Sequence, residues 1–165
     1  TQGAMRNAQK SSYRESYSEP MSQGTRCRQL AMYVIYEAPF NMLCDSPSNY
    51  EKEKECTEFI AEIPTVWDQT VALDGKIGEY AVIARRAGEN WYVGGLTNWS
   101  QREIEVDLSF LPEGTFEIES IQDGVNANKI ASDFRIVKQT ADNKKVLKVK
   151  MARGGGFAMK ITPAK

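Results

Sequence analysis

The chemistry open to this 165-residue chain is limited first by its complete lack of histidine. A Ser-His-Asp or Cys-His nucleophile, a zinc site that uses histidine and a histidine general base are all excluded within the chain. Acid–base chemistry would have to use carboxylate, Lys, Tyr or Cys side chains. Four carboxylates with regular spacing, Glu51, Glu55, Glu58 and Glu62, share one helical stripe. They could bind a cation or a basic partner, but we interpret them as a solvated helix face.

Cysteine and glycine patterns offer little further chemistry. Cys27, Cys44 and Cys56 are an odd set without CxxC spacing. They predict buried free thiols rather than a metal knuckle or a dense disulfide framework. The three glycines at 154–156 precede a strand-like run, not a Lys-Ser pair and a helix, so they predict a turn or bulge rather than a phosphate loop.

Aromatic side chains supply the other candidate chemistry, because flat rings can stack on the apolar faces of sugars. Trp67, Trp99 and Tyr92 are the candidates for such stacking. Trp91 lies in an alternating, strand-like run and is predicted to be a buried anchor of the core. Candidate rings that are exposed on one flat face would favour a sugar-binding module, whereas buried rings would favour a supporting domain.

The charge balance argues against another group of functions. With 21 basic and 22 acidic residues the net charge is −1, which gives no electrostatic case for binding nucleic acid or an anionic membrane. No run approaches the roughly 20 apolar residues of a membrane helix, and the first twenty residues lack the apolar core of a signal peptide. The start at Thr1, without Met, suggests a piece of a longer protein.

The elements that must position these side chains change character at residue 64. The first 23 residues are polar and predict a loop. Apolar spacing and proline positions then predict a helix over residues 24–38, a buried strand over 40–44 and a second helix over 50–63. Helix, strand and helix together form a fragment of alternating α/β architecture.

Beyond residue 64 the pattern becomes all-β. Residues 79–98 predict a long β-hairpin that turns at 87–90 and is apolar on both faces, so it should be buried on both sides. The predicted strands are 79–86, 91–97, 103–108, 115–122, 134–140, 146–151 and 157–162. The fold class is therefore mainly β with α: residues 65–165 form an antiparallel β-sandwich of seven to eight strands, preceded by the helix–strand–helix unit of residues 1–64.

Four stretches carry a resemblance that these patterns cannot supply. They are TQGAMRNA, SQGTRCRQLAMYVIYEAPFNMLCDSPSNY, ECTEFIAEIPTVWDQTVALDGKIGEYAVIARRAGENWYVGGLTNW and GGGFAMKI. Together they resemble the carboxyl-terminal part of glycoside hydrolase family 97, over essentially the whole chain. The resemblance implies an exported or periplasmic enzyme of a glycan-degrading bacterium that hydrolyses α-glucosidic or α-galactosidic bonds. Such an enzyme has an amino-terminal β-sandwich, a central (β/α)8 barrel and a carboxyl-terminal β-sandwich.

The resemblance also implies where the elements belong. Residues 1–64 would end the catalytic barrel, with residues 40–44 as its eighth strand, and residues 65–165 would be the terminal sandwich. Barrel active sites are built from loops at the carboxyl ends of the strands, which here means residues 3–6 and 45–50. Asp45, Ser46 and Asn49 are therefore candidate pocket-lining residues, although these residue types also form ordinary turns.

The family's catalytic and calcium-binding glutamates lie upstream, so no catalytic or metal-binding residue is assigned in this chain. Calcium is implied for complete enzymes of the inverting α-glucosidase type, whereas the α-galactosidase members retain configuration. Two functions remain open. We prefer a supporting part of an α-glycosidase acting on an α-linked oligosaccharide, inactive by itself; the alternative is a stand-alone carbohydrate-binding sandwich.

The resemblance implies that the barrel residues of this chain would pack against neighbours in the upstream part of the enzyme. We expect the apolar residues between 24 and 43 to fold back on the sandwich, to pair with another copy or to be partly disordered.

Overall fold

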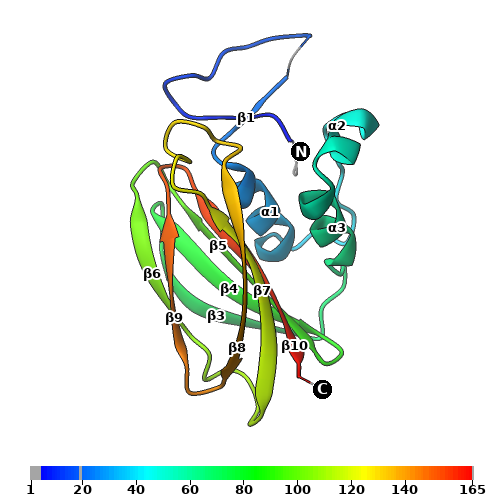
Figure 1. The fold of residues 1–165 in the computed structure, drawn as a ribbon, viewed down its shortest axis with the longest axis vertical. Helices are drawn as coiled ribbons and strands as arrows, with labels where there is room; N and C mark the ends of the chain where they lie inside the picture. Colours follow the sequence, from blue (N-terminus) through cyan, green and yellow to red (C-terminus); the bar gives the residue numbers. More distant parts are fainter. Residues whose placement is uncertain (1–4, 19, 165) are drawn as a thin grey trace.

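The computed structural model describes residues 5–18 and 20–164, in which a β-sandwich carries a helical layer on one side (Figure 1). One sheet has six antiparallel strands in the order β3-β4-β5-β10-β7-β8, and the other pairs β6 with β9. The strands are β3 (Gln69–Lys76), β4 (Tyr80–Ala87), β5 (Asn90–Thr97), β6 (Arg102–Asp107), β7 (Thr115–Asp123), β8 (Phe134–Asp142), β9 (Val146–Met151) and β10 (Gly156–Pro163). The predicted antiparallel sandwich is confirmed.

The sandwich core lies between the two sheets. Along β9, Leu147, Val149 and Met151 point inward while the lysines between them are exposed, as the alternation predicts. Trp91 on β5 is 4% exposed and packs the edge of its ring against Phe110, with the ring centroids 5.0 Å apart. The predicted buried anchor is therefore confirmed.

The predicted hairpin of residues 79–98 is β4 and β5, which pair along their whole length around the turn at Gly88. Strand β5 is covered on both sides, and two adjacent glycines allow this. A side chain at Gly94 would meet the backbone of Ala31 at 2.9 Å, while one at Gly95 would overlap the ring of Phe157. Gly94 thus lets α1 pack closely on β5, and Gly95 leaves room for the Phe157 ring in the sandwich core.

The helical layer is shorter and more broken than predicted. Helix α1 (Arg26–Ile35) begins after Thr25, whose hydroxyl accepts a hydrogen bond from the Arg28 N–H, and covers β5 and β10. The single helix predicted over residues 50–63 is instead α2 (Pro47–Lys52) and α3 (Lys54–Glu62). The reason lies in local sequence: Ser46 and Pro47 form a favourable start three residues earlier, and Glu53 leaves the helical conformation.

The strand predicted over residues 40–44 is wrong. Leu43 makes a single β-bridge but no strand forms over these residues, and Phe40, Met42 and Leu43 are 81%, 61% and 51% exposed. A strand needs neighbours that pair with it along its length, and the bridge at Leu43 does not extend into a ladder. The loop before α1, predicted to have little regular structure, contains only the two-residue parallel strands β1 (Asn7–Ala8) and β2 (Ser22–Gln23) within residues 5–18 and 20–23.

Three smaller predictions can be compared with the structure. Asp74 and Gly75 form a pair whose residue types predict a turn, yet they lie within β3, which has a bulge after Ala72, and the chain turns at Gly78 instead. The turn predicted at the glycines 154–156 lies at Arg153 and Gly154, and Gly156 already begins β10. All three cysteines are free, and Cys27 and Cys56 are buried. No helix among the described residues is long and apolar enough to cross a membrane.

Candidate functional site

The predicted pocket-lining residues lie together at the start of α2, where they bind one another and the backbone of the first described residues. The Asp45 carboxylate accepts hydrogen bonds from the N–H groups of Met5, at 2.9 Å, and Arg6, at 3.3 Å. Its other oxygen accepts from Asn49 and from the Ser46 N–H. Ser46 itself caps α2. That these residues line a substrate pocket stays a prediction.

The electrostatic state of Asp45 follows from these bonds. Partial burial alone would raise the pKa of this carboxyl, but the hydrogen bonds from Asn49, Ser46, Met5 and Arg6 outweigh it and hold the pKa below its usual value. Asp45 is therefore a stable anion whose oxygens are already engaged, which suits it to hold backbone in place rather than to transfer protons.

Arg26 belongs to the same cluster and was not among the predicted site residues. Its side chain is 5% exposed; one guanidinium nitrogen donates to the Met5 carbonyl at 2.7 Å, and another lies 2.8 Å from the Glu53 carboxylate. The guanidinium also lies 5.6 Å from the centre of the Phe134 ring. An arginine directly before Cys27 of the apolar stripe was the available signal, since a cation on a buried face requires a partner.

A second buried carboxylate joins α1 to the sandwich. Asp123, at the end of β7, accepts hydrogen bonds from the N–H groups of Ala152, at 2.8 Å, and Gly156, at 3.0 Å. Burial raises the pKa of Asp123, and hydrogen bonds that include those from Thr25 and Cys27 partly offset this. A side chain at Gly155 would overlap the carboxylate. The glycine turn therefore encloses an aspartate rather than a phosphate.

Comparison with known proteins places this arrangement in a family. A family model described as "Glycosyl-hydrolase 97 C-terminal, oligomerisation" matches residues 66–162. A retaining α-galactosidase of Bacteroides thetaiotaomicron is 60% identical over 161 residues, which is 98% of this chain and 24% of that protein. This chain belongs to glycoside hydrolase family 97. The resemblance stated from the sequence is thus confirmed.

Other members of family 97 agree with this assignment. A probable retaining α-galactosidase of Streptomyces bingchenggensis is 31% identical over 130 residues, covering 79% of this chain and 19% of that protein. A family 97 enzyme of Pseudoalteromonas sp. strain K8, solved in complex with acarbose, superimposes with a TM-score of 0.82 at 36% identity over 86% of this chain and 23% of its own. The chain spans about a quarter or less of the length of these relatives.

The aromatic residues considered for sugar stacking do not share one exposed face. Tyr92 is buried, and its hydroxyl donates to the Glu62 carbonyl. Trp67 is half-buried, with its ring edge-on to Tyr92 at 5.5 Å between centroids. Trp99, also half-buried, lies in the turn after the other end of β5 and packs on Gly154. By the criterion set from the sequence, this arrangement favours the supporting role.

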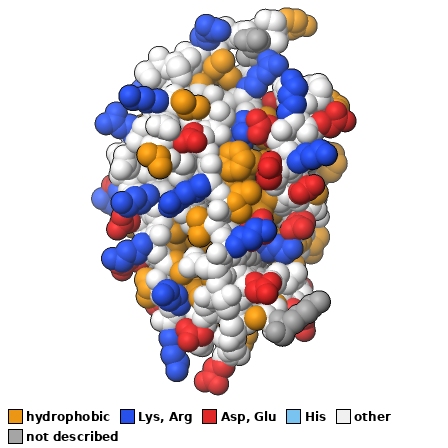
Figure 2. Space-filling view, viewed as in Figure 1, with side chains coloured by type: hydrophobic (Ala, Val, Ile, Leu, Met, Phe, Trp, Pro, Cys, Tyr) orange, Lys and Arg blue, Asp and Glu red, His pale blue; other side chains and the backbone are white. Residues whose placement is uncertain are grey.

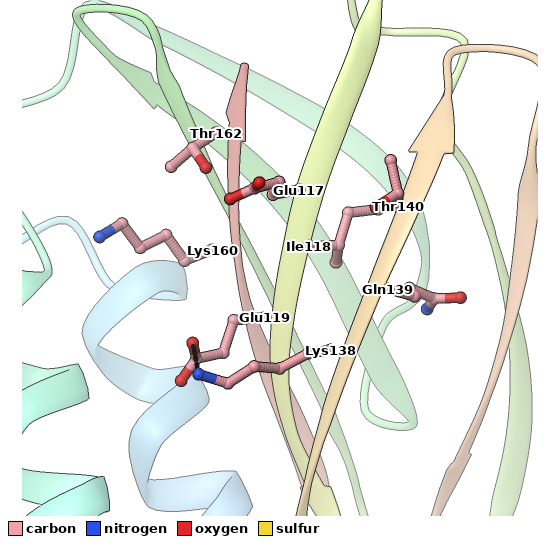
Figure 3. Close-up of a pocket in the computed structure, with 8 residues that line it drawn as sticks. All are labelled: Glu117, Ile118, Glu119, Lys138, Gln139, Thr140, Lys160 and Thr162. Carbon is pink, nitrogen blue, oxygen red and sulfur yellow. Dashed lines mark ion pairs between the residues drawn. The ribbon is translucent and has the colours of Figure 1, made fainter. Parts of the chain in front are cut away.

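A charged hollow on the outer part of β7, β8 and β10 holds further carboxylates (Figure 3). Glu119 lies 2.8 Å from Lys138, and Lys160 lies 2.8 Å from Glu62 at the end of α3. Figure 2 likewise shows basic and acidic side chains interspersed over one face of the molecule. These charges neutralise one another at the surface, where they resemble ordinary solvated ion pairs.

The resemblance places the calcium ligands of the α-glucosidase type upstream of this chain, and that expectation stays a prediction. Within residues 5–18 and 20–164, no three or more Asp, Glu, Cys or His side chains converge to hold a metal ion. Asp45 and Asp123 engage main-chain N–H groups instead.

Proposed function

We propose that this chain is the carboxyl-terminal, non-catalytic part of a family 97 α-galactosidase. The observation that carries the proposal is the 60% identity to a retaining α-galactosidase over 98% of this chain but only 24% of that protein. We divide the chain as the sequence predicts, into a barrel part over residues 1–64 and a supporting sandwich over residues 65–165. The parent substrate would be an α-linked galactoside.

The carboxylates of the described residues support a non-catalytic role. Glycoside hydrolysis needs two carboxyl groups facing each other across the scissile bond. Asp45 and Asp123 hold backbone N–H groups, and Glu62 and Glu119 form surface ion pairs. None of these is paired with a second free carboxylate across an enclosed pocket that could raise an acid's pKa toward neutrality.

The supporting role rests on how the helical layer meets the sheet. Helix α1 lies across β5 and β10, with Gly94 and Ala158 giving it close access, and it shares a buried cluster with α3 and the sheet. The segment at 40–44, between α1 and α2, leaves three large apolar side chains exposed. We infer that the parent barrel covers them, because large apolar patches seldom stay in water.

The test uses the complete enzyme. We expect it to hydrolyse nitrophenyl α-galactoside in preference to nitrophenyl α-glucoside and, by analogy with the 60% identical relative, to release the α-anomer first. Proton NMR during early turnover distinguishes the anomers. Preference for the glucoside, with release of the β-anomer, would place the enzyme with the α-glucosidase type instead.

A second role, self-association through the sandwich, is favoured by the description of the matching family model and by strand β3. This strand is the edge of the six-stranded sheet and is largely exposed, so it can pair with another strand. We propose that the complete enzyme forms oligomers through the sandwich. Sedimentation should show a species larger than one chain, and a strict monomer would refute this role.

An exported, periplasmic location is also proposed, on the family resemblance. Fractionation of the source bacterium should recover the enzyme outside the cytoplasm.

A calcium requirement, if the parent is of the α-glucosidase type, would involve ligands outside the described residues. Measuring the activity of the complete enzyme after chelation of calcium tests this requirement.

A further inference from the structure

We propose that Arg26 and Asp45 are positioning residues of the parent enzyme, which hold the Met5–Arg6 segment in place as part of the wall of its sugar pocket. The inference rests on the proposed function, since it needs a pocket that the complete enzyme supplies. It differs from the sequence prediction, in which Asp45 itself faced the substrate.

The contacts form a clamp on one peptide segment. Asp45 accepts from the N–H of Met5, and Arg26 donates to the carbonyl of the same residue, so both of its main-chain polar groups bind charged side chains. Asp45 also accepts from the next N–H, that of Arg6. Hydrogen bonds to ionised groups are shorter and stronger than neutral ones, so this segment is held more firmly than a loop normally is.

The clamp joins three segments that are far apart in the sequence. Arg26 is the first residue of α1, Asp45 directly precedes Ser46, the N-cap of α2, and Glu53, which pairs with Arg26, lies between α2 and α3. Strand β1 and helix α2 lie at the same end of the molecule, the top of Figure 1. In β/α units the ends of strands meet the starts of the following helices, and ligands bind at that edge.

A polar hollow of about 420 Å³ lies beside the clamp. Its lining includes groups able to bind sugar hydroxyls: Arg6, Asn7, Asn49, Lys52 and Glu53. Met5 itself is 4% exposed and also lines the hollow. A shift of Met5 would therefore change the shape of this hollow and the direction of the Arg6 side chain.

The chain contains a matched comparison for Arg26. Arg85 on β4 is equally buried, donates to the Ile35 carbonyl at 3.0 Å, lies 3.4 Å from Glu37 and has its guanidinium 5.6 Å from the Trp67 ring. Arg85 thus makes the same kinds of contact, but at the carboxyl end of α1. Replacing either arginine removes similar interactions, so loss of stability alone cannot separate a positioning role from a structural one.

The experiment compares four variants in the complete enzyme: Arg26→Met, Arg26→Lys, Asp45→Asn and Arg85→Met. We measure the melting temperature of each variant. We then measure kcat and KM on nitrophenyl α-galactoside and α-glucoside at a temperature well below the lowest of these melting points. Arg26→Met and Arg85→Met should lower the melting temperature by similar amounts. Arg26→Met and Asp45→Asn should lower kcat/KM at least roughly tenfold, because small misplacements in a pocket have large kinetic effects, and Arg85→Met should stay within about twofold of wild type.

Arg26→Lys should recover part of the lost activity, since lysine can donate to Met5 or pair with Glu53 but cannot match the planar fork of arginine. Equal kinetics for the Arg26 and Arg85 variants would overturn the positioning role. If Arg26→Met does not fold, the positioning role is tested by whether Arg26→Lys and Asp45→Asn lose more kcat/KM than Arg85→Met does. If the wild-type enzyme prefers the glucoside, the proposed function is wrong, but the positioning role can still be tested by comparing the variants on the glucoside. If the wild-type enzyme hydrolyses neither substrate, both the proposed function and the positioning role are overturned.

Discussion

The sandwich and the helical layer share one sheet but differ in how completely they are closed. Between the sheets, inward-facing side chains such as Trp91, Val149 and Phe157 are almost wholly buried by partners within the chain. On the helical side, α1 is buried against β5 and β10, yet the segment that follows it leaves Phe40 and Met42 in solvent. The core of the sandwich is closed by residues of this chain. The helical layer is closed only where it packs on the sheet, and the segment over residues 40–44 is its open side.

This difference explains which sequence patterns determine structure within the chain. A strand whose neighbours are present forms where its alternation predicts it. The segment predicted as a strand over residues 40–44 pairs only at Leu43, and its large apolar side chains are exposed. Burial against the sheet follows from packing within the chain, whereas the exposed apolar side chains of residues 40–44 mark the surface that we propose the parent barrel covers.

The largest effect should come from the closed side. Trp91→Ala should lower the free energy of unfolding by about 3–5 kcal/mol, the usual range for deleting a core aromatic. Urea denaturation of the chain measures this. A loss below about 1 kcal/mol would show that the ring is not part of the core and would reopen its use in sugar stacking.

The adjacent glycines of β5 test the two sides of the sheet separately. Gly95→Ala should displace the Phe157 ring, and Gly94→Ala should push α1 away from β5; each should cost about 1–3 kcal/mol, as overpacking does. Hydrogen exchange distinguishes them. Gly94→Ala should raise exchange mainly in α1, whereas Gly95→Ala should raise it across the sandwich. Identical exchange patterns would contradict a sheet with two independent packing faces.

A pH dependence should come from Asp45. Its folded pKa lies below the usual Asp value of about 3.9, so its stabilising contribution is present above that pH and is lost as pH falls through the folded pKa. Asp45→Asn should therefore destabilise the chain by about 1 kcal/mol at pH 7, and the difference should shrink below about pH 4. Urea midpoints for both proteins across this range measure it. A difference that does not change with pH would show that the charge of Asp45 is unimportant.

The smallest effect is expected on the open side. Phe40→Ser should change the stability of this chain by no more than about 0.5 kcal/mol, as exposed substitutions usually do. In the complete enzyme the same change should cost several times more, because the barrel would bury this ring. Thermal melts of both proteins test this, and equal effects would mean that nothing covers residues 40–44.

The sequence predicted the sandwich well because its determinants are local. Alternation placed Leu147, Val149 and Met151 inward, and both arms of the hairpin were found with their turn. The break at Glu53 was missed because the stripe from Cys56 to Ile63 hides it. Strand β3 was missed because a bulge lets Asp74 and Gly75 remain in a strand.

The candidate site was only partly predictable. Asp45, Ser46 and Asn49 were found as a group and do lie together, but the partners of Asp45 come from about forty residues away, at Met5 and Arg6. Periodicity does not encode such long-range hydrogen bonds. Arg26 and Asp123 were missed for the same reason, because a charge in an apolar pattern signals burial without identifying its partner.

The central claim, that this chain is a non-catalytic part of an α-glycosidase, is tested most directly by assaying it alone. Purified chain and complete enzyme should be compared on nitrophenyl α-galactoside and α-glucoside, with and without calcium. The account predicts turnover by the complete enzyme and none by the chain, because Asp45 and Asp123 bind backbone N–H groups and no two carboxylates are seen to face each other across an enclosed pocket of the described residues. Turnover by the chain that disappears on Asp45→Asn would contradict it.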